Sequence, residues 1–305
     1  MMRLIVLFIL SFTILSACQS SSPKNDPEKR MFQFEPIKGI KYYEVRRAFE
    51  NGIAFNDLGF QQEPEWAVRF LSDSTVQVYS PSLNKMIDCD LIYSHDAVYN
   101  FAREWFRVKE LSTDSLILQR LEVNGKVIAH DIRSDVYMTF YSENYLQKIN
   151  KPVEELRKAR SVDSLYVRDK SASANAHPMD SSYFFAARNP VEFKTKSKII
   201  QIEKVSTVDK LQNHSRSFDY LYPEYKVVIS PAYKQFAYTI SAVVDTTGHL
   251  TVYKFNAIDE YKENRRKVLQ GILDIYISNL CKVKPGSTLG IKHSSLIVLD
   301  LIGKP

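Results

Sequence analysis

The chain has 305 residues, of which 45% are hydrophobic, 25% are charged and 12% are aromatic. These fractions lie in the globular range and exclude a fully disordered or collagen-like protein, while a content of only three Cys excludes a disulfide-framework protein. The net charge of +6 is dispersed along the chain without a block of one sign, which indicates a solvated surface and no nucleic-acid partner.

Residues 1–17 have the pattern of a secretory signal peptide. Arg3 gives a positive start, and the apolar run Leu4–Leu15 is too short for a membrane-spanning helix, which needs about 20 residues. The sequence Leu15-Ser16-Ala17-Cys18 resembles the lipobox of bacterial lipoproteins. This resemblance implies that Cys18 is lipidated and becomes the first residue of the mature protein. The alternative is an ordinary cleaved signal followed by a chance cysteine.

The lipidated Cys18 and a polar tether occupy residues 18–36. The segment Ser20–Arg30 is polar and contains two prolines, a composition typical of a flexible spacer. Several acyl chains, such as palmitate, hold a protein stably on a membrane, because each buried methylene contributes about 0.8 kcal/mol. Gln19 stands where the inner-membrane retention signal of enterobacterial lipoproteins has Asp, so the resemblance implies an outer-membrane lipoprotein that does not span the membrane.

Residues 37–150 are predicted to form an antiparallel β domain, a barrel or a sandwich. Asn51-Gly52 and Asn124-Gly125 are turn signals between β-rich segments, because both central residues of such a turn need positive φ. Strands about 8 to 12 residues apart favour this architecture. Asp96–Arg103 is a candidate short helix. The predicted strands are Tyr42–Phe49, Trp66–Leu71, Thr75–Tyr79, Trp105–Lys109, Leu116–Val123, Val127–His130 and Val136–Tyr141.

Three runs of this region, 66–79, 106–121 and 136–141, look like the lipocalin-like barrels of exported Bacteroidetes lipoproteins. The resemblance implies a barrel whose interior can hold a small apolar ligand. The alternative is that the barrel is filled by its own side chains, as small barrels usually are. The candidate filling residues are Phe70, Val76, Val78, Leu116, Leu118, Val123, Met138 and Phe140.

Residues 151–224 are predicted to contain a short helix, a linker and a strand. The helix covers residues 151–156, with Pro152 in its first turn. Lys170–Ser182 is rich in small and polar residues without periodicity, which predicts a surface loop or an interdomain linker. Lys198–Val205 is predicted to be a strand.

Residues 225–305 have the order β, β, α, β. Residues 236–244 alternate in character, and the turn Asp245–Gly248 leads into a second strand, Leu250–Phe255. Apolar residues at helical spacing predict an amphipathic helix over Glu263–Leu280, and Ser294–Leu301 supplies the last strand. We expect a three-stranded sheet with one helix on its face, which makes the whole protein α+β. The predicted helix stripe consists of Val268, Leu269, Ile272, Leu273, Tyr276 and Leu280.

The region Tyr225–Leu301 resembles the C-terminal domain of TonB-type proteins. The matching features are the strand-turn Val244–Gly248, the long helix, Lys284-Pro285-Gly286 after it, Gly290 and the closing apolar strand. In that family the domain docks partners, notably by pairing an exposed strand edge with an extended segment of another protein. Because a membrane-spanning helix followed by a long proline-rich arm is missing, we expect only the fold and a docking role, with an envelope protein bound at the sheet edge.

Motifs of nucleophilic, metal or nucleotide sites are not found in the sequence, so we expect no catalytic residue, no cofactor and no metal. Cys89 and Cys281 are expected to be free thiols rather than a disulfide. The residues considered for catalysis are Glu44, Glu50, Glu63 and Glu65, as a carboxylate pair for glycoside hydrolysis, and His95, His130, His177, His214, His249 and His293. Surface charge and surface histidine are the default interpretations of these residues.

The leading hypothesis is a non-catalytic envelope lipoprotein that acts as a binding or protein-docking module. One alternative is an envelope hydrolase of glycans or peptides, which needs polar residues of the first domain to converge in a pocket. The other alternative is a carrier of a small apolar ligand in the N-terminal barrel. The interior of the region 37–150 therefore distinguishes these hypotheses: it is packed, apolar and empty, or lined with convergent polar groups.

Overall fold

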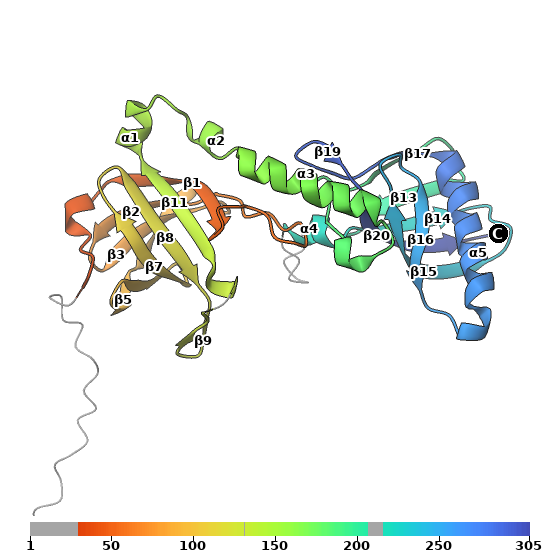
Figure 1. The fold of residues 1–305 in the computed structure, drawn as a ribbon, viewed down its shortest axis with the longest axis horizontal. Coiled ribbons are helices and arrows are strands. Elements are labelled where there is room, and N and C mark those ends of the chain that lie inside the picture. Colours follow the sequence, from red (N-terminus) through yellow and green to blue (C-terminus); the bar gives the residue numbers. More distant parts are fainter. Residues whose placement is uncertain (1–29, 131, 207–215) are drawn as a thin grey trace, which may run out of the picture.

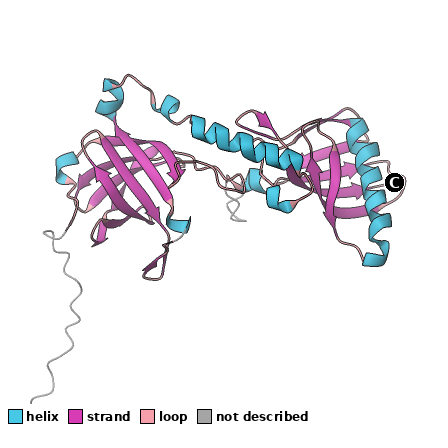
Figure 2. Ribbon diagram, viewed as in Figure 1, coloured by secondary structure: helices cyan, strands magenta, loops and turns pink. Residues whose placement is uncertain are grey.

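The structure is a computed structural model that describes residues 30–130, 132–206 and 216–305. A β-rich N-terminal lobe and an α+β C-terminal lobe are joined by a long helix and by a loop (Figure 1). Strands form the body of each lobe, and helices lie beside and between the two sheets (Figure 2). The signal peptide, Cys18 and most of the predicted tether lie outside the described residues.

A nine-stranded antiparallel sheet forms the N-terminal lobe, in the order β4-β3-β2-β1-β11-β8-β7-β6-β5. The strands β4 and β5 stand at opposite ends of this order, yet only Leu91 separates them in the chain. The sheet therefore curls into a nearly closed barrel, and the predicted antiparallel barrel-like architecture is confirmed. The strands are β1 (Lys41–Phe49), β2 (Ala67–Ser72), β3 (Thr75–Ser80), β4 (Lys85–Asp90), β5 (Ile92–His95), β6 (Val98–Phe101), β7 (Glu104–Leu111), β8 (Ser115–Leu121) and β11 (Val136–Ser142).

Local predictions in this lobe are met in part. The Asn124-Gly125 hairpin is confirmed, since β9 (Val123–Asn124) pairs with β10 (Val127–Ile128) around Gly125, whose φ is +66°. The candidate helix Asp96–Arg103 is wrong, because β6 occupies its centre and buries bulky side chains while pairing with β7. The strands β4 and β5 were not predicted, because their side chains are mostly exposed and carry no apolar alternation.

The barrel is filled by its own side chains. Phe34 stacks on Phe70 with 4.3 Å between the ring centroids, and Phe101 stacks on Phe106 at 4.5 Å. These rings belong to one continuous cluster of buried residues. Side chains thus occupy the space that an apolar ligand would take. Of the candidate filling residues all are buried except Val123, which is half-buried; they are Phe70, Val76, Val78, Leu116, Leu118, Met138 and Phe140.

A β-bulge in β1 turns charged side chains into the protein. The register of β1 on β11 shifts between Glu44 and Arg46, and both residues are buried. The Glu44 carboxylate accepts two hydrogen bonds of 2.7 Å from the Arg47 guanidinium. It also accepts bonds from the backbone N–H groups of Glu65 and Trp66, at 2.8 and 2.9 Å. The buried charge is therefore compensated, and it fixes where the chain enters β2.

Three helices follow the barrel: α1 (Glu143–Lys148), α2 (Val153–Leu156) and α3 (Ser161–Ala176). The predicted short helix at 151–156 corresponds to α2. The predicted linker Lys170–Ser182 is wrong in its first part, because α3 extends to Ala176. The helix shows little apolar periodicity in the sequence, since its buried residues include the polar or small Asp163, Ser171 and Ala174.

The residue Arg46 joins the barrel to α3 through a buried ion pair. Its two terminal nitrogens donate to the Asp163 carboxylate at 2.6 and 2.8 Å. Asp163 also accepts bonds of 2.8 Å from the backbone N–H groups of Ala54 and Arg160. Burial raises the pKa of Asp163, but the hydrogen bonds from Arg46 and the two backbone N–H groups outweigh it, so the pKa lies below its usual value.

A small third core lies next to this ion pair. It consists of Ala54, Phe55, Val167, Ala174 and Phe185, which come from the loop after β1, from α3 and from the segment that follows α3. The loop continues toward the C-terminal lobe (Figure 1). There its Glu63, Gln61 and Glu65 contact Arg188, the Tyr220 hydroxyl and Arg216, respectively. The loop 50–66 and α3 together hold the two lobes.

A five-stranded sheet forms the C-terminal lobe, in the order β13-β14-β20-β15-β16. It has five strands rather than the three predicted, because two strands precede the β-β-α-β unit: β14 pairs with the closing strand β20, and β13 pairs with β14. The β14–β20 pair is parallel and the others are antiparallel. The strands of this sheet are β13 (Ile200–Lys204), β14 (Glu224–Ile229), β15 (Phe236–Val244), β16 (Leu250–Phe255) and β20 (Ser295–Gly303). The lobe also contains the short helix α4 (Phe218–Leu221). Two further strand pairs are β12 (Glu192–Thr195) with β17 (Cys281–Lys284) and β18 (Ser287–Thr288) with β19 (Ile291–Lys292).

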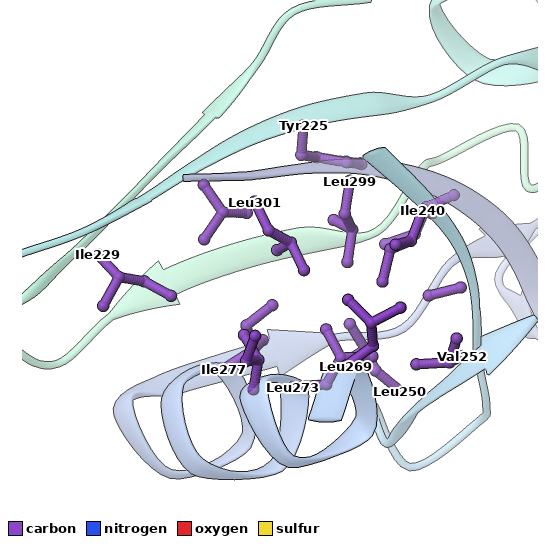
Figure 3. Packing of buried hydrophobic residues seen from close by; sticks show 14 of the residues in the cluster. Tyr225, Ile229, Ile240, Leu250, Val252, Leu269, Leu273, Ile277, Leu299 and Leu301 are labelled. Carbon is purple, nitrogen blue, oxygen red and sulfur yellow. The ribbon is translucent and has the colours of Figure 1, made fainter. Parts of the chain in front are cut away.

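One helix packs on a face of this sheet. Helix α5 (Lys262–Ile272) continues as a π-helix over Leu273–Ser278, as the amphipathic pattern predicted. Leu269, Leu273 and Ile277 face the sheet residues labelled in Figure 3. Val268, which the predicted stripe included, instead faces solvent, because the buried stripe runs through 269, 272, 273 and 277. The apolar core of the lobe lies between helix and sheet.

The ion pair between barrel and α3 yields a stability prediction. Replacing Asp163 by Ala is expected to lower the free energy of unfolding by about 3–5 kcal/mol, because Arg46 then stays buried without its counter-ion. Urea unfolding followed by circular dichroism measures this change. Glu35→Ala, which removes an exposed ion pair with Lys38, is the control and should cost less than about 0.5 kcal/mol. Equal stability of the two variants would contradict the prediction.

Candidate functional site

The two edges of the C-terminal sheet differ in how their backbone groups are satisfied. The edge at β16 is covered by side chains of α5. The backbone N–H of Val252 donates to Oε1 of Gln270 at 3.0 Å, and its carbonyl accepts a bond of 2.7 Å from Arg266. The Gln270 amide also donates to the carbonyl of Leu250 at 2.9 Å. Because these groups are already bonded, β16 cannot add another strand without losing the bonds.

The opposite edge, at β13, has no further strand paired to it among the residues that the structure describes. The N–H of Val205 bonds to the Glu224 carbonyl and the N–H of Ser230 bonds to the Ile199 carbonyl, so the odd-numbered residues of this segment direct their backbone groups toward β14. Ile200, Ile202 and Lys204 therefore direct theirs away from the sheet. Within the described part of the chain, no residue bonds to these outward groups. They form a template on which an extended segment can pair.

The sheet face opposite α5 carries a shallow cavity of about 470 Å³. Its polar groups lie on three neighbouring strands, with Lys226 on β14, Asp300 on β20 and Thr239 on β15. The Thr239 hydroxyl donates to the Asp300 carboxylate at 2.6 Å. Apolar Ala237 and Ile302 complete the wall. The sheet face opposite α5 therefore carries both apolar and charged groups. It includes residues of β14, the strand next to the β13 edge.

The closing strand β20 lies inside the sheet. It is paired with β14 on one side and with β15 on the other along most of its length. β20 is therefore not an edge strand, whereas β13 is. β13 precedes the β-β-α-β unit that the sequence pattern predicted. Sequence reasoning predicted the strand, over Lys198–Val205, but had no signal for its place in the sheet.

The carboxylates considered for catalysis do not form a pair. Glu44 is bonded to Arg47 and to backbone N–H groups, as described above. Glu63 pairs with Arg188 at 2.7 Å, and Glu65 pairs with Arg216. These three side chains thus hold the loop 50–66 in place. Glu50 alone lines a cavity.

That cavity, of about 440 Å³, lies on the outer surface of the barrel. Beside Glu50 it exposes Arg107, Gln119 and Tyr137, which stand opposite one another on β7, β8 and β11. Burial and the negative charges of Glu50 and Asp135 raise the pKa of Tyr137. Polar residues of the first lobe thus converge here. Sequence reasoning missed the three strand residues, because their register was not known.

The histidines occupy different environments. His95, His177 and His249 are exposed, as expected, and His130 lines the cavity on the barrel. His214 lies outside the described residues. His293 is fully buried, so the surface interpretation is wrong for this residue.

The buried His293 is neutral. Its Nδ1 lies 3.1 Å from the Ser294 carbonyl, which can only accept, so Nδ1 carries the proton. Its Nε2 lies 3.0 Å from the Thr288 hydroxyl and accepts from it. Burial lowers the pKa of His293, because the charged form loses its hydration, although the Ser294 carbonyl acts in the opposite direction.

Cys89 and Cys281 are free, and the Cys281 thiol is buried, which raises its pKa. In the described ranges, His, Cys, Asp and Glu side chains form no group of three or more that could hold a metal ion. None of the helices described is long and apolar enough to cross a membrane. No protein-family model and no curated protein matches the chain.

The neutral, buried imidazole predicts a loss of stability in acid. The folded-state pKa of His293 lies below the unfolded value of about 6.5, so the unfolded chain binds the proton more tightly and stability falls as pH drops below about 6.5. Melting temperatures between neutral and mildly acidic pH measure this slope. His293→Gln should flatten it, whereas His95→Gln, at an exposed site, should leave it unchanged. The same slope in both variants would contradict the assignment.

Proposed function

We propose that the protein is an envelope lipoprotein, anchored through Cys18, that docks an extended segment of another envelope protein at the β13 edge of its C-terminal sheet. The observation that carries this proposal is the contrast between the two sheet edges. Side chains of α5 bond the backbone groups of β16, whereas the outward groups of Ile200, Ile202 and Lys204 find no partner in the described chain. Exposed edge strands are usually protected, so an open one has a functional meaning.

The arrangement of the C-terminal lobe supports the same proposal. The strands β15 and β16, helix α5 and strand β20 follow in the order expected from the resemblance to TonB C-terminal domains. Docking by strand addition uses main-chain hydrogen bonds for affinity and side-chain pockets for specificity. The cavity near Lys226 and Asp300 begins on β14, the strand next to the open edge, and offers such a pocket.

The lipid anchor is the part of the proposal that rests on the sequence alone. The lipobox-like Leu15-Ser16-Ala17-Cys18 and the polar segment after it support attachment to the outer membrane. In this arrangement a flexible segment connects the folded lobes to the membrane anchor. The lobes can then contact a partner in the same membrane or beside it.

A second candidate function, hydrolysis of an envelope glycan or peptide, is favoured by the polar cavity on the barrel. Glu50, Asp135, His130 and Tyr137 line it together, and carboxylates, imidazole and phenol are groups that perform acid–base chemistry. If this function holds, Glu50→Gln and Asp135→Asn abolish turnover of an envelope glycan or peptide substrate, whereas the edge variants below do not affect it.

The anchor is tested by changing the cysteine. We expect Cys18→Ala to move the protein from the membrane fraction to the soluble fraction of cells, because the acyl chains have no other attachment site. Fractionation and metabolic labelling with palmitate measure the change. Cys89→Ala is the control and should leave both readouts as they are. A Cys18→Ala protein that stays in the membrane fraction and keeps its label contradicts the proposal.

The open edge is tested by removing one outward N–H group. Ile202→Pro removes a donor that points away from β14, so the sheet keeps its ladder while the edge loses a bond needed for strand addition. With a photo-crosslinking residue at the exposed position of Gln201, we expect the adduct with the envelope partner to fall at least fivefold. Ile202→Val, which keeps the N–H, is the matched control. Unchanged crosslinking in the proline variant would exclude this edge.

A further inference from the structure

A cavity of about 360 Å³ lies where the two lobes are joined. Its walls come from three segments: Asp57 of the loop 50–66, one face of α3, and residues 182–184 after α3. Pockets that bind small molecules are frequent at domain interfaces and have volumes of about 300–1,000 Å³, so this cavity has the size of a small-ligand site. Neither the docking edge nor the cavity on the barrel shares a residue with it.

The polar side of the cavity is organised by one helix face. Tyr166, Lys170 and Ser173 have the spacing i, i+4, i+7 along α3 and line the wall together. The Asp57 carboxylate accepts a bond of 2.8 Å from the Tyr166 hydroxyl and pairs with the Lys170 ammonium at 2.6 Å. These contacts lower the pKa of Asp57, so the carboxylate stays charged. These two contacts orient the exposed carboxylate of Asp57 toward α3.

Other polar groups of the wall are available to a ligand. Asp169 carries a carboxylate that bonds to none of the described residues through its side chain. The hydroxyl of Ser173 donates to the carbonyl of Asp169 and can still accept. Ser182 adds a second hydroxyl. Acceptors and donors thus lie side by side in the wall.

Aromatic rings form the other side of the cavity. Tyr183 is 40% exposed and stacks on His177, with 4.4 Å between ring centroids and 28° between ring planes. Phe184 is held edge-on against Tyr253 of β16 at 4.9 Å. Each ring is therefore held by an aromatic neighbour, and Tyr183 remains partly accessible to solvent. An aromatic ring in such a position can contact the C–H groups of a ligand.

We propose that this cavity binds a neutral sugar residue of a glycan. The charges of the wall disfavour an anionic ligand, which would meet the carboxylates of Asp57 and Asp169, while the Lys170 ammonium is already paired with Asp57. A sugar has hydroxyl groups that donate to carboxylates and accept from the ammonium, and a C–H face that packs on Tyr183 or Phe184. The proposal does not rest on the docking function.

The test is a titration of the purified protein with neutral sugars. The probes are N-acetylglucosamine and glucose, observed by saturation-transfer NMR, with glucosamine and glucuronate as cationic and anionic comparisons. We expect neutral sugars to bind in the millimolar range, which is typical of single small ligands with few contacts. We expect the anionic probe to bind at least fivefold more weakly than the neutral sugars.

Variants place the binding in the cavity. Asp169→Ala and Tyr183→Ala remove exposed side chains and should reduce the affinity for the neutral sugar at least tenfold. The matched controls, Asp259→Ala and Tyr261→Ala, lie in the short 3-10 turn that precedes α5 and should bind as the unchanged protein does. The proposal is overturned if neither neutral sugar binds, if a charged probe binds more tightly, or if the cavity variants bind as well as the controls.

Discussion

The buried ion pair between Arg46 and Asp163 is the interaction on which the arrangement of the two lobes depends. Removing both charges from water is costly, and the cost is offset only because every carboxylate oxygen is bonded: to the guanidinium and to the backbone N–H groups of Ala54 and Arg160. These partners belong to the barrel, to the loop that leaves it and to α3. One carboxylate thus fixes the relative positions of three segments, and the third core and the interlobe cavity are built around them.

Much of the fold followed from local patterns. Apart from β4, β5 and β6, the strands of the barrel and the β15–β16 hairpin have alternating or β-rich sequences, and α5 has a clear apolar stripe, so each could be predicted from its own residues. Helix α3 could not be predicted in this way. Its buried face carries Asp163 and Ser171 rather than apolar residues, because its main partner is the guanidinium of a residue more than a hundred positions earlier.

The position of the open sheet edge could not be predicted from the sequence. The sequence pattern indicated a sheet with a docking edge, yet the edges of a sheet depend on which distant strands pair. β13 and β14 join β20 through contacts across more than sixty residues, so no local pattern could show that β20 is interior. The protection of β16 likewise depends on Gln270 and Arg266, whose polar side chains look like ordinary solvated positions of a helix in the sequence.

The single residue between β4 and β5 has a consequence for how many partners the protein can hold. Leu91 joins β4 and β5, the two edge strands of the barrel sheet, and β4 also contacts β6. The two edges of this sheet therefore lie close to each other. With β16 covered, the two large sheets leave β13 as the one open edge in the described chain. Through the edges of these two sheets, strand pairing would therefore join one chain to one partner and would not propagate into a fibre.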